Sequence, residues 1–398
     1  MSSRSSSGGS RQITIAAAAA GFLTFTNMWC TQALLPVLGA ALHASPARTG
    51  LTVTAPLAAT AAMAPLIGAI SDRFGRKRFI AGAALLLVIP TLLAAASVNL
   101  PMLIACRFAQ GLLLPFIFIV TIAYIGDEFS GPAAMRIAGT YTAGTITGGF
   151  SGRFIAGLAT EAFGWRAAFL CIGLLTLAMA LLVITLLPRE RQFRPVSGLG
   201  AALRSFPSHL SNPRLLATYA VGFGVLFSLV TVFTFINFRL ADAPYHLGPA
   251  ALGSIFVVYL GGAVISPVAG RLAAKYGHRA VMAASLGLSL SGLALTLAQP
   301  LWIIGLGLLL TCCGLFTQQT IATGYTALAA RAAKSTAVGL YVTCYYIGGS
   351  AGGILPGGIW HSAGWPGCAA ITTAAQLAAF AIAMAFWRPL SPRPAGAP

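Results

Sequence analysis

GAISDRFGRKRF, residues 68–79, is a short polar stretch between two long apolar runs. It holds one acid, Asp72, and four clustered cations, with glycines at Gly68 and Gly75. Between two membrane spans such cations fix the topology, because Lys and Arg accumulate in cytoplasmic loops. The glycines allow two helix ends to approach closely. The stretch therefore predicts a chain that crosses a membrane, turns on the cytoplasmic side and crosses back.

The composition places most of the chain in a membrane. The 398 residues are 58% hydrophobic and 8% charged, with a mean hydropathy of +0.86. A soluble domain carries about 25% charged residues, so most of this surface cannot face water. Apolar runs of about 20 residues, the length that crosses a bilayer, recur throughout. They predict twelve helices, at residues 13–37, 50–70, 79–97, 101–125, 137–160, 165–187, 214–237, 249–270, 279–298, 301–327, 335–359 and 366–387.

The first apolar run follows a basic start, as a secretory signal does. A signal has an apolar region of only about 7–15 residues, whereas this run covers 13–37 and the chain crosses again afterwards. We therefore expect an uncleaved first helix. Residues 1–12 are rich in Ser and Gly and are expected to form a disordered cytoplasmic tail.

The net charge of +18 raises the question of a nucleic-acid partner. Twelve crossings with a cytoplasmic N-terminus leave only Arg48, Arg166 and Arg239 outside, and Arg107 and Arg153 within the membrane. The other nineteen of the 24 Lys and Arg residues then face the cytoplasm, as the positive-inside rule requires. The basic charge thus reports topology, and we expect no nucleic-acid partner, an inner-membrane location and two cytoplasmic termini.

The polar residues do not form the arrangement that an enzyme or a channel needs. The five histidines fall in or near loops, and the seven cysteines lie in apolar runs without metal-ligand spacing. We therefore expect no enzyme activity, no metal and no cofactor. A channel would need rings of charges or a selectivity filter, which the sequence does not supply.

An internal repeat divides the chain. Residues 139–165 and 339–365 align without a gap, and GRLAAKYGHR at 270–279 is a second copy of the loop at 68–77. Two such halves are a known transporter plan. We therefore predict an all-α membrane protein with twelve transmembrane helices in two pseudo-symmetric six-helix halves. The expected domains are 13–187 and 214–387, joined by a cytoplasmic linker at 188–213 and followed by a tail at 388–398.

The loop at 68–79 resembles the signature of the major facilitator superfamily of secondary transporters. Every fixed position of Gly-x-x-x-Asp-Arg-x-Gly-Arg-[Arg/Lys] matches, at Gly68, Asp72, Arg73, Gly75, Arg76 and Lys77. The resemblance implies an inner gate, in which Asp72 meets the start of the eleventh helix near Ser335. Arg76 would bridge to Asp127 or Glu128 at the end of the fourth helix. The alternative is that these are solvated loop charges.

Two arginines lie within the membrane. Arg107 and Gly111 resemble the family's second motif, which implies that Arg107 faces the central cavity and takes part in coupling. The alternative is a structural arginine that bonds backbone carbonyls. Arg153 lies beside Gly148 and Gly149, at the position of the family's exporter signature. The proline of that signature is absent, which weakens the inference of antiport.

The six acids all fall near helix ends or in loops. Coupling through a mid-membrane carboxylate is thus not supported, which leaves Glu161, Asp127 or Glu128 near the surfaces as proton carriers, or an uncoupled facilitator. In the family the cavity is lined mainly by helices 1, 4, 7 and 10. The matching polar residues here are Asn27, Gln32, Arg107, Asn237, Gln318 and Gln319, beside Tyr341.

These residues predict a carrier of a small polar or amphipathic organic solute. Amides and aromatic rings around a cation leave an anionic solute as one option. The resemblance favours the drug and sugar efflux branch, with alternating access, proton antiport and a monomer in the bilayer. Import of a metabolite or uncoupled facilitation is the second candidate.

Overall fold

A computed structural model describes residues 3–190, 206–330 and 334–387. Most of the expected linker and the whole tail at 388–398 lie outside these ranges. The described residues form helices and no strand. The first half contains α1 (Ser3–Trp29), α2 (Leu35–Ala41), α3 (Pro46–Phe74), α4 (Arg76–Ala95), α5 (Leu100–Glu128), α6 (Gly131–Phe163) and α7 (Trp165–Leu186). The second half contains α9 (Pro213–Ala241), α10 (Pro249–Ser254), α11 (Val258–Tyr276), α12 (His278–Leu295), α13 (Leu301–Ala329) and α14 (Lys334–Phe386).

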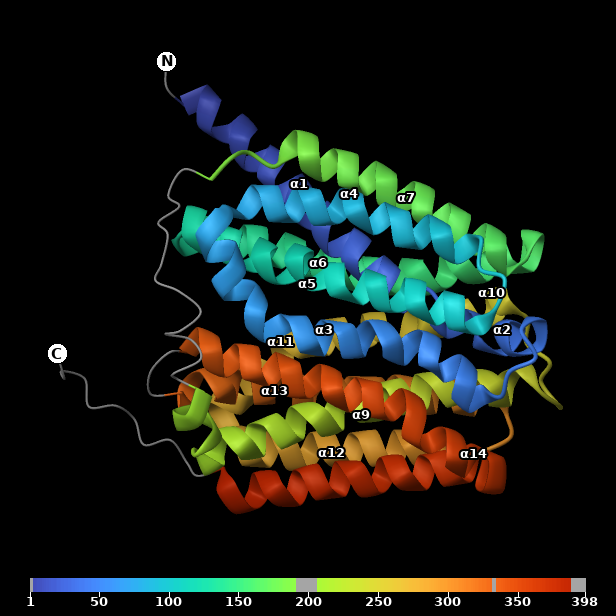
Figure 1. Cartoon of the computed structure of the whole chain (residues 1–398). Coiled ribbons are helices and arrows are strands. Elements are labelled where there is room, and N and C mark those ends of the chain that lie inside the picture. Colours follow the sequence, from blue (N-terminus) through green and yellow to red (C-terminus); the bar gives the residue numbers. More distant parts are fainter. Residues whose placement is uncertain (1–2, 191–205, 331–333, 388–398) are drawn as a thin grey trace.

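The helices account for twelve crossings. Nine stretches of the described residues are long and apolar enough to span a membrane. One of them, Thr336–Phe386, holds two helices that meet at Gly364, where the backbone leaves helical geometry. Helices α6 and α12 are less apolar but run beside the others (Figure 1). The predicted all-helical fold is thereby confirmed.

The repeat seen in the sequence reappears in the backbone. Gly75 and Gly277 join α3 to α4 and α11 to α12, with φ of 92° and 85°. Gly164 and Gly364 lie in the turn between the fifth and the sixth crossing of each half, with φ of 84° and 56°. An L side chain is strained at such φ values, so the paired glycines make the same tight turn in both halves.

Glycines also set the closest helix packing. A Cβ on Gly148 or Gly152 of α6 would lie 2.3 or 2.6 Å from a backbone oxygen of α1. The matching Gly348 and Gly352 of α14 would lie 2.1 and 2.4 Å from backbone oxygens of α9. Any larger residue would push these helices apart, so the repeat encodes one packing surface twice.

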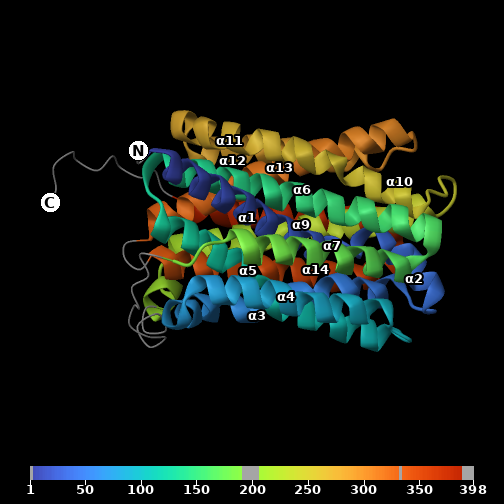
Figure 2. The same cartoon turned by 90° about the horizontal axis from the view of Figure 1, so that it is seen from above.

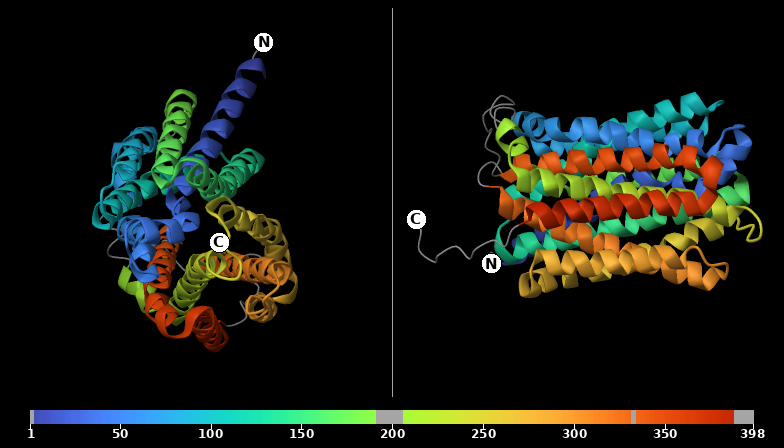
Figure 3. Two further views of the ribbon diagram at one scale, coloured as in Figure 1. Left: turned by 90° about the vertical axis from the view of Figure 1, so that its right-hand side faces the viewer. Right: turned by 90° about the horizontal axis from the view of Figure 1, so that it is seen from below.

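The two halves lie side by side with their helices along one axis (Figures 1 and 2). The start of α1 and the end of α14 lie at the same end of the bundle, as an even number of crossings requires (Figure 1). We call this the terminal end, and the opposite end, which holds Ser45, Asn99 and Gly164, the distal end. The halves meet mainly along two helix pairs, α3 with α14 and α6 with α10. The end-on view in Figure 3 shows the two groups of helices.

The largest differences from the predicted helices are one much earlier start and two interruptions. Helix α1 begins at Ser3, so the helix covers most of the expected tail, because no proline interrupts the chain there. The first predicted helix breaks after Trp29, with a 3-10 turn η1 (Gln32–Leu34) before α2. The eighth is interrupted by a second 3-10 turn, η2 (Ile255–Val257). Apolar length alone does not reveal such breaks.

Candidate functional site

Arg107 of α5 fills the break in the first helix. Its Nη1 donates to the backbone oxygen of Asn27 at 2.6 Å, and its Nη2 to that of Met28 at 2.7 Å. Its Nε donates to the backbone oxygen of Thr52 in α3 at 3.0 Å. The last carbonyls of a helix lack partners within the helix, and here a fully buried guanidinium supplies them. Such contacts are those expected of a structural arginine that bonds backbone carbonyls, and they join α5 to α1 and α3.

Asn27 belongs to the same polar network. Its Nδ2 donates to Thr176 Oγ1 of α7 at 2.7 Å, and its Oδ1 accepts from Thr91 Oγ1 of α4 at 2.8 Å. Gln110 donates to Thr91 at 2.8 Å and accepts from Arg107. Asn27 is fully buried, and its amide joins α1 to α4 and α7 of the first half. Gln110 was missed from the sequence, although its position three residues after Arg107 on one helix face was a usable signal.

Arg153 of α6 is bound at the centre of the contact between halves. Its Nε and Nη2 donate to Gln32 Oε1 at 2.9 and 2.7 Å, and its Nη1 donates to the Gly149 oxygen at 2.7 Å. Its guanidinium carbon lies 4.8 Å from the ring centre of Trp29 in the first half. The rings of Phe256 and Tyr259 in the second half lie 4.3 and 4.7 Å away. Arg153 is thus a cation in an aromatic cage built by both halves.

No described carboxylate compensates this cation. Arg153 is 1% exposed, whereas Asp127, Glu161 and Asp242 are exposed and Glu128 and Glu190 half-buried. The side chain of Asp72 is outside the described part. Cation–π contacts contribute roughly 0.5–2 kcal/mol each, less than a buried charge costs when it is unpaired. The cage therefore favours an additional negative group.

Gln32 connects Arg153 to the second half. Asn237 Nδ2 of α9 donates to the Gln32 backbone oxygen at 3.0 Å, and Gln32 Nε2 donates to Thr234 Oγ1 at 3.3 Å. The Gln32 carbonyl is free because Pro36, four residues on, has no N–H to donate. Gln32 and Asn237, both predicted from the sequence, thus meet at one point between the halves.

Several buried polar atoms remain unpaired among the described residues. Those on residues in or beside the expected site are Thr31 Oγ1, Asn237 Oδ1, Gln318 Nε2 and Tyr341 Oη. Gln319, also expected at the site, is half-buried on α13. Such atoms cost about 1–3 kcal/mol each when they stay unpaired. An amide nitrogen donates, an amide oxygen accepts and the two hydroxyls can do either, so these atoms could bind a solute or water.

The signature loop is built at the terminal end. Arg76 Nε lies 2.5 Å from Asp127 Oδ2, one of the two pairings expected from the sequence. Arg76 is 11% and Asp127 40% exposed. The structure does not describe the side chains of Gly68, Asp72 and Arg73, nor Ser335, so the contact expected for Asp72 lies outside the described residues.

Glu190 also binds this loop, a contact that was not predicted from the sequence. Its Oε2 accepts from the Lys77 backbone nitrogen at 3.3 Å, at the first turn of α4. A carboxylate is favourable at a helix N-terminus. Glu190 follows α7 and is more than a hundred residues from the loop in the chain, so only the fold brings them together.

At the distal end a carboxylate bridges the halves. Glu161 Oε2 of α6 accepts from the Ala250 backbone nitrogen of α10 at 2.9 Å. A Cβ on Gly157 would lie 2.3 Å from the Pro249 oxygen, and one on Gly253 would lie 2.7 Å from the Arg153 oxygen. The distal ends of α6 and α10 are therefore in direct backbone contact.

Known proteins agree with this architecture. A family model described as the Major Facilitator Superfamily matches residues 17–258 and 240–398. The chain belongs to this superfamily. It is 34% identical over 360 residues to the inner membrane transport protein YnfM of Escherichia coli (strain K12), covering 90% of this chain and 86% of that one. An uncharacterized transporter of Buchnera aphidicola subsp. Schizaphis graminum is 32% identical over 357 residues, with coverage of 89% and 86%. The chain is thus a membrane transporter of the major facilitator type.

Two solved structures share the fold. The nucleoside transporter NupG aligns with a TM-score of 0.80 at 14% identity and covers 96% of this chain and 100% of that one. A bacterial homologue of the human lysosomal transporter Spinster, in an inward-facing and unoccupied conformation, gives 0.77 at 15% identity, with coverage of 96% and 99%. At these identities the likeness concerns the fold alone.

Proposed function

We propose that this transporter exports a small amphipathic organic anion across the inner membrane by alternating access. The observation that carries the proposal is Arg153, a buried cation with no described carboxylate, held by aromatic rings from both halves and by the Gln32 amide. A carboxylate or sulfonate on the solute would supply the missing charge. Arg153 has a planar fork of donors suited to such a group.

The surroundings of Arg153 favour an apolar or aromatic body on the solute. Phe256 and Tyr259 pack against Phe233 and, for Tyr259, against Phe316. Aromatic rings bind flat apolar groups by stacking or edge contacts. Asn237 Oδ1 and Gln318 Nε2 would then orient polar substituents.

The described conformation is best understood as closed at the distal end. Contacts between halves gather there: Glu161 with Ala250, Thr54 with the Ser350 oxygen at 3.1 Å, and Gln32 with Asn237. The positive-inside rule assigns the terminal end to the cytoplasm, so this state would accept solute from the cytoplasm.

Export would be coupled to protons by antiport. This step rests on the resemblance of the signature loop to the efflux branch and on Glu161, whose carboxylate bonds the two halves at the distal end. Protonation from outside would weaken that bond and favour opening. Uncoupled facilitation is the second candidate, favoured because the buried side chains of the described residues include no Asp or Glu. An inside-negative potential of 100 mV drives a monovalent anion outward by about 2.3 kcal/mol.

Thermal stabilisation of the purified protein tests the solute class. We expect benzoate to raise the melting temperature of the wild type, benzamide to do so much less, and Arg153→Gln to abolish the difference. Arg166→Gln is the matched control, because Arg166 stacks on Trp165 at the distal end, away from the site. Equal responses to the acid and the amide, or an Arg153→Gln protein that still distinguishes them, would exclude the anion site.

A further inference from the structure

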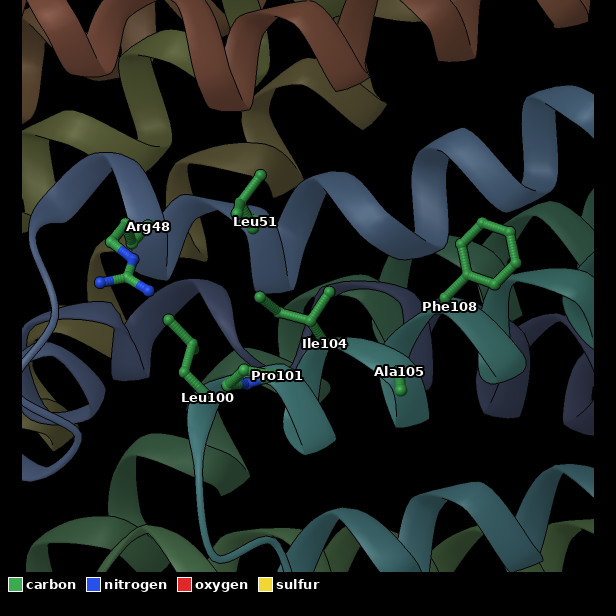
Figure 4. A pocket seen from close by; sticks show the side chains of 7 residues that line it. All are labelled: Arg48, Leu51, Leu100, Pro101, Ile104, Ala105 and Phe108. Carbon is green, nitrogen blue, oxygen red and sulfur yellow. The ribbon is translucent and has the colours of Figure 1, made fainter.

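A groove of about 540 Å³ lies between α3 and α5, at the distal end. Its walls are Leu51 of α3 and Leu100, Ile104 and Phe108 of α5, with Arg48 at its distal mouth (Figure 4). Among the described residues that line it, Arg48 alone is charged. The groove is separate from the Arg153 site, because it lies within the first half.

Arg48 differs from the other two arginines at this end. Arg166 Nη2 donates to the Ser97 oxygen at 3.1 Å. Arg239 donates to the oxygens of Thr296 and, at 2.8 Å, Ala298. The side chain of Arg48 has no hydrogen bond or ion pair with any residue that the structure describes. It is an exposed cation directed over an apolar groove (Figure 4).

The dimensions match one leaflet of a bilayer. From Leu100 to Phe108 the groove follows α5 for about 12 Å, at 1.5 Å per residue. One leaflet contributes about half of the roughly 30 Å hydrocarbon core. The charge lies at the mouth, where headgroups lie, and the apolar walls lie deeper. Helices α3 and α5 both begin at this mouth, which adds positive partial charge there.

We propose that the groove binds one anionic phospholipid of the surrounding leaflet, with its phosphate at Arg48 and the upper part of one acyl chain against Ile104 and Phe108. A zwitterionic lipid would bind more weakly, because the described lining of the groove holds no acid for its ammonium group. Leu51 and Phe108 are the sequence neighbours of Thr52 and Arg107, which bond to each other behind the groove. The bound lipid would therefore support the joint that holds the first helix at its break.

Delipidated protein in neutral detergent provides the test. We expect phosphatidylglycerol to raise the melting temperature at concentrations about fivefold lower than phosphatidylethanolamine, which corresponds to roughly 1 kcal/mol per basic residue near an anionic membrane surface. Arg48→Gln should remove this preference. Ala105→Trp, which fills the groove and keeps the charge, should also remove it. Arg78→Gln, an exposed cation at the terminal end, is the control and should keep it.

Three results would overturn the proposal. The first is an unchanged lipid preference in both Arg48→Gln and Ala105→Trp. The second is a wild type that does not distinguish the two lipids. The third is an equal effect of inorganic phosphate, which would indicate a simple anion site. None of these outcomes depends on the solute proposed for Arg153, since the readout is lipid binding without transport.

Discussion

The Nδ2 of Asn237 lies 3.0 Å from the backbone oxygen of Gln32, and this bond joins the two halves of the transporter. The oxygen is free because Pro36 cannot donate to it. Pro36 of the first half thus leaves a carbonyl unpaired, and the Asn237 amide of the second half binds it. The same glutamine holds Arg153 through its side chain, so the contact between halves and the cation of the site share one residue.

Asn237→Ala is expected to weaken distal closure. The change leaves the Gln32 carbonyl without a partner, at a cost of about 1–3 kcal/mol in the closed state. Spin labels at positions 163 and 243, on the distal ends of the two halves, should then report a larger population at long distance. The exposed Cys171 must first be replaced.

Ser228→Ala is the matched control for this change. Ser228 is also buried on α9, but its hydroxyl bonds within the helix, to the Gly224 oxygen at 2.7 Å. It should leave the distance distribution unchanged. An Asn237→Ala protein with the wild-type distribution would show that this bond does not hold the distal end.

Arg107→Ala is expected to destabilise the fold as well as stop transport. It leaves carbonyls of Asn27, Met28 and Thr52 unpaired at the break. At about 1 kcal/mol for each of the three carbonyls and 2–4 °C per kcal/mol, the melting temperature should fall by roughly 6–12 °C. Arg107→Lys should be intermediate, since an ammonium lacks the planar fork. Full stability with lost transport would instead support the coupling role that the family resemblance implies.

Much of the fold could be predicted from the sequence because apolar length and glycine spacing are local signals. The turns at Gly75 and Gly277, and the contacts of Gly148 and Gly348, follow directly from the repeat. The break after Trp29 could not be predicted in this way. It depends on Arg107, which is distant in the chain and whose contacts only the fold reveals.

The site was predictable in residue type but not in arrangement. Gln32, Arg153 and Asn237 stood out as polar residues in apolar runs, and they do meet. Asn27 stood out for the same reason but is bonded within the first half. Phe256 and Tyr259 gave no signal, because aromatic residues are common in membrane helices and only their position around Arg153 distinguishes them.

Reversing the charges of Arg76 and Asp127 tests the inner gate. Arg76→Asp and Asp127→Arg should each slow transport severalfold, and the double variant should recover most of the rate. For a partly exposed pair we expect a coupling energy of about 0.5–1 kcal/mol. Lys275→Ala, in the second copy of the loop, should have less effect because Ala274 replaces the acid there. Additive losses in the double variant would indicate that the two charges act independently.

Glu161→Gln separates the distal contact from proton coupling. The glutamine oxygen still accepts from the Ala250 nitrogen, 2.9 Å away from the carboxylate in the native protein, but the side chain no longer titrates. In proteoliposomes with an imposed pH gradient we expect this variant to keep counterflow exchange and lose gradient-driven accumulation. Asp242→Asn removes another exposed acid at the same end and should keep both activities. Uphill transport by Glu161→Gln at the wild-type level would exclude Glu161 as the coupling group. A wild type that follows the membrane potential but ignores the pH gradient would favour uncoupled export of an anion.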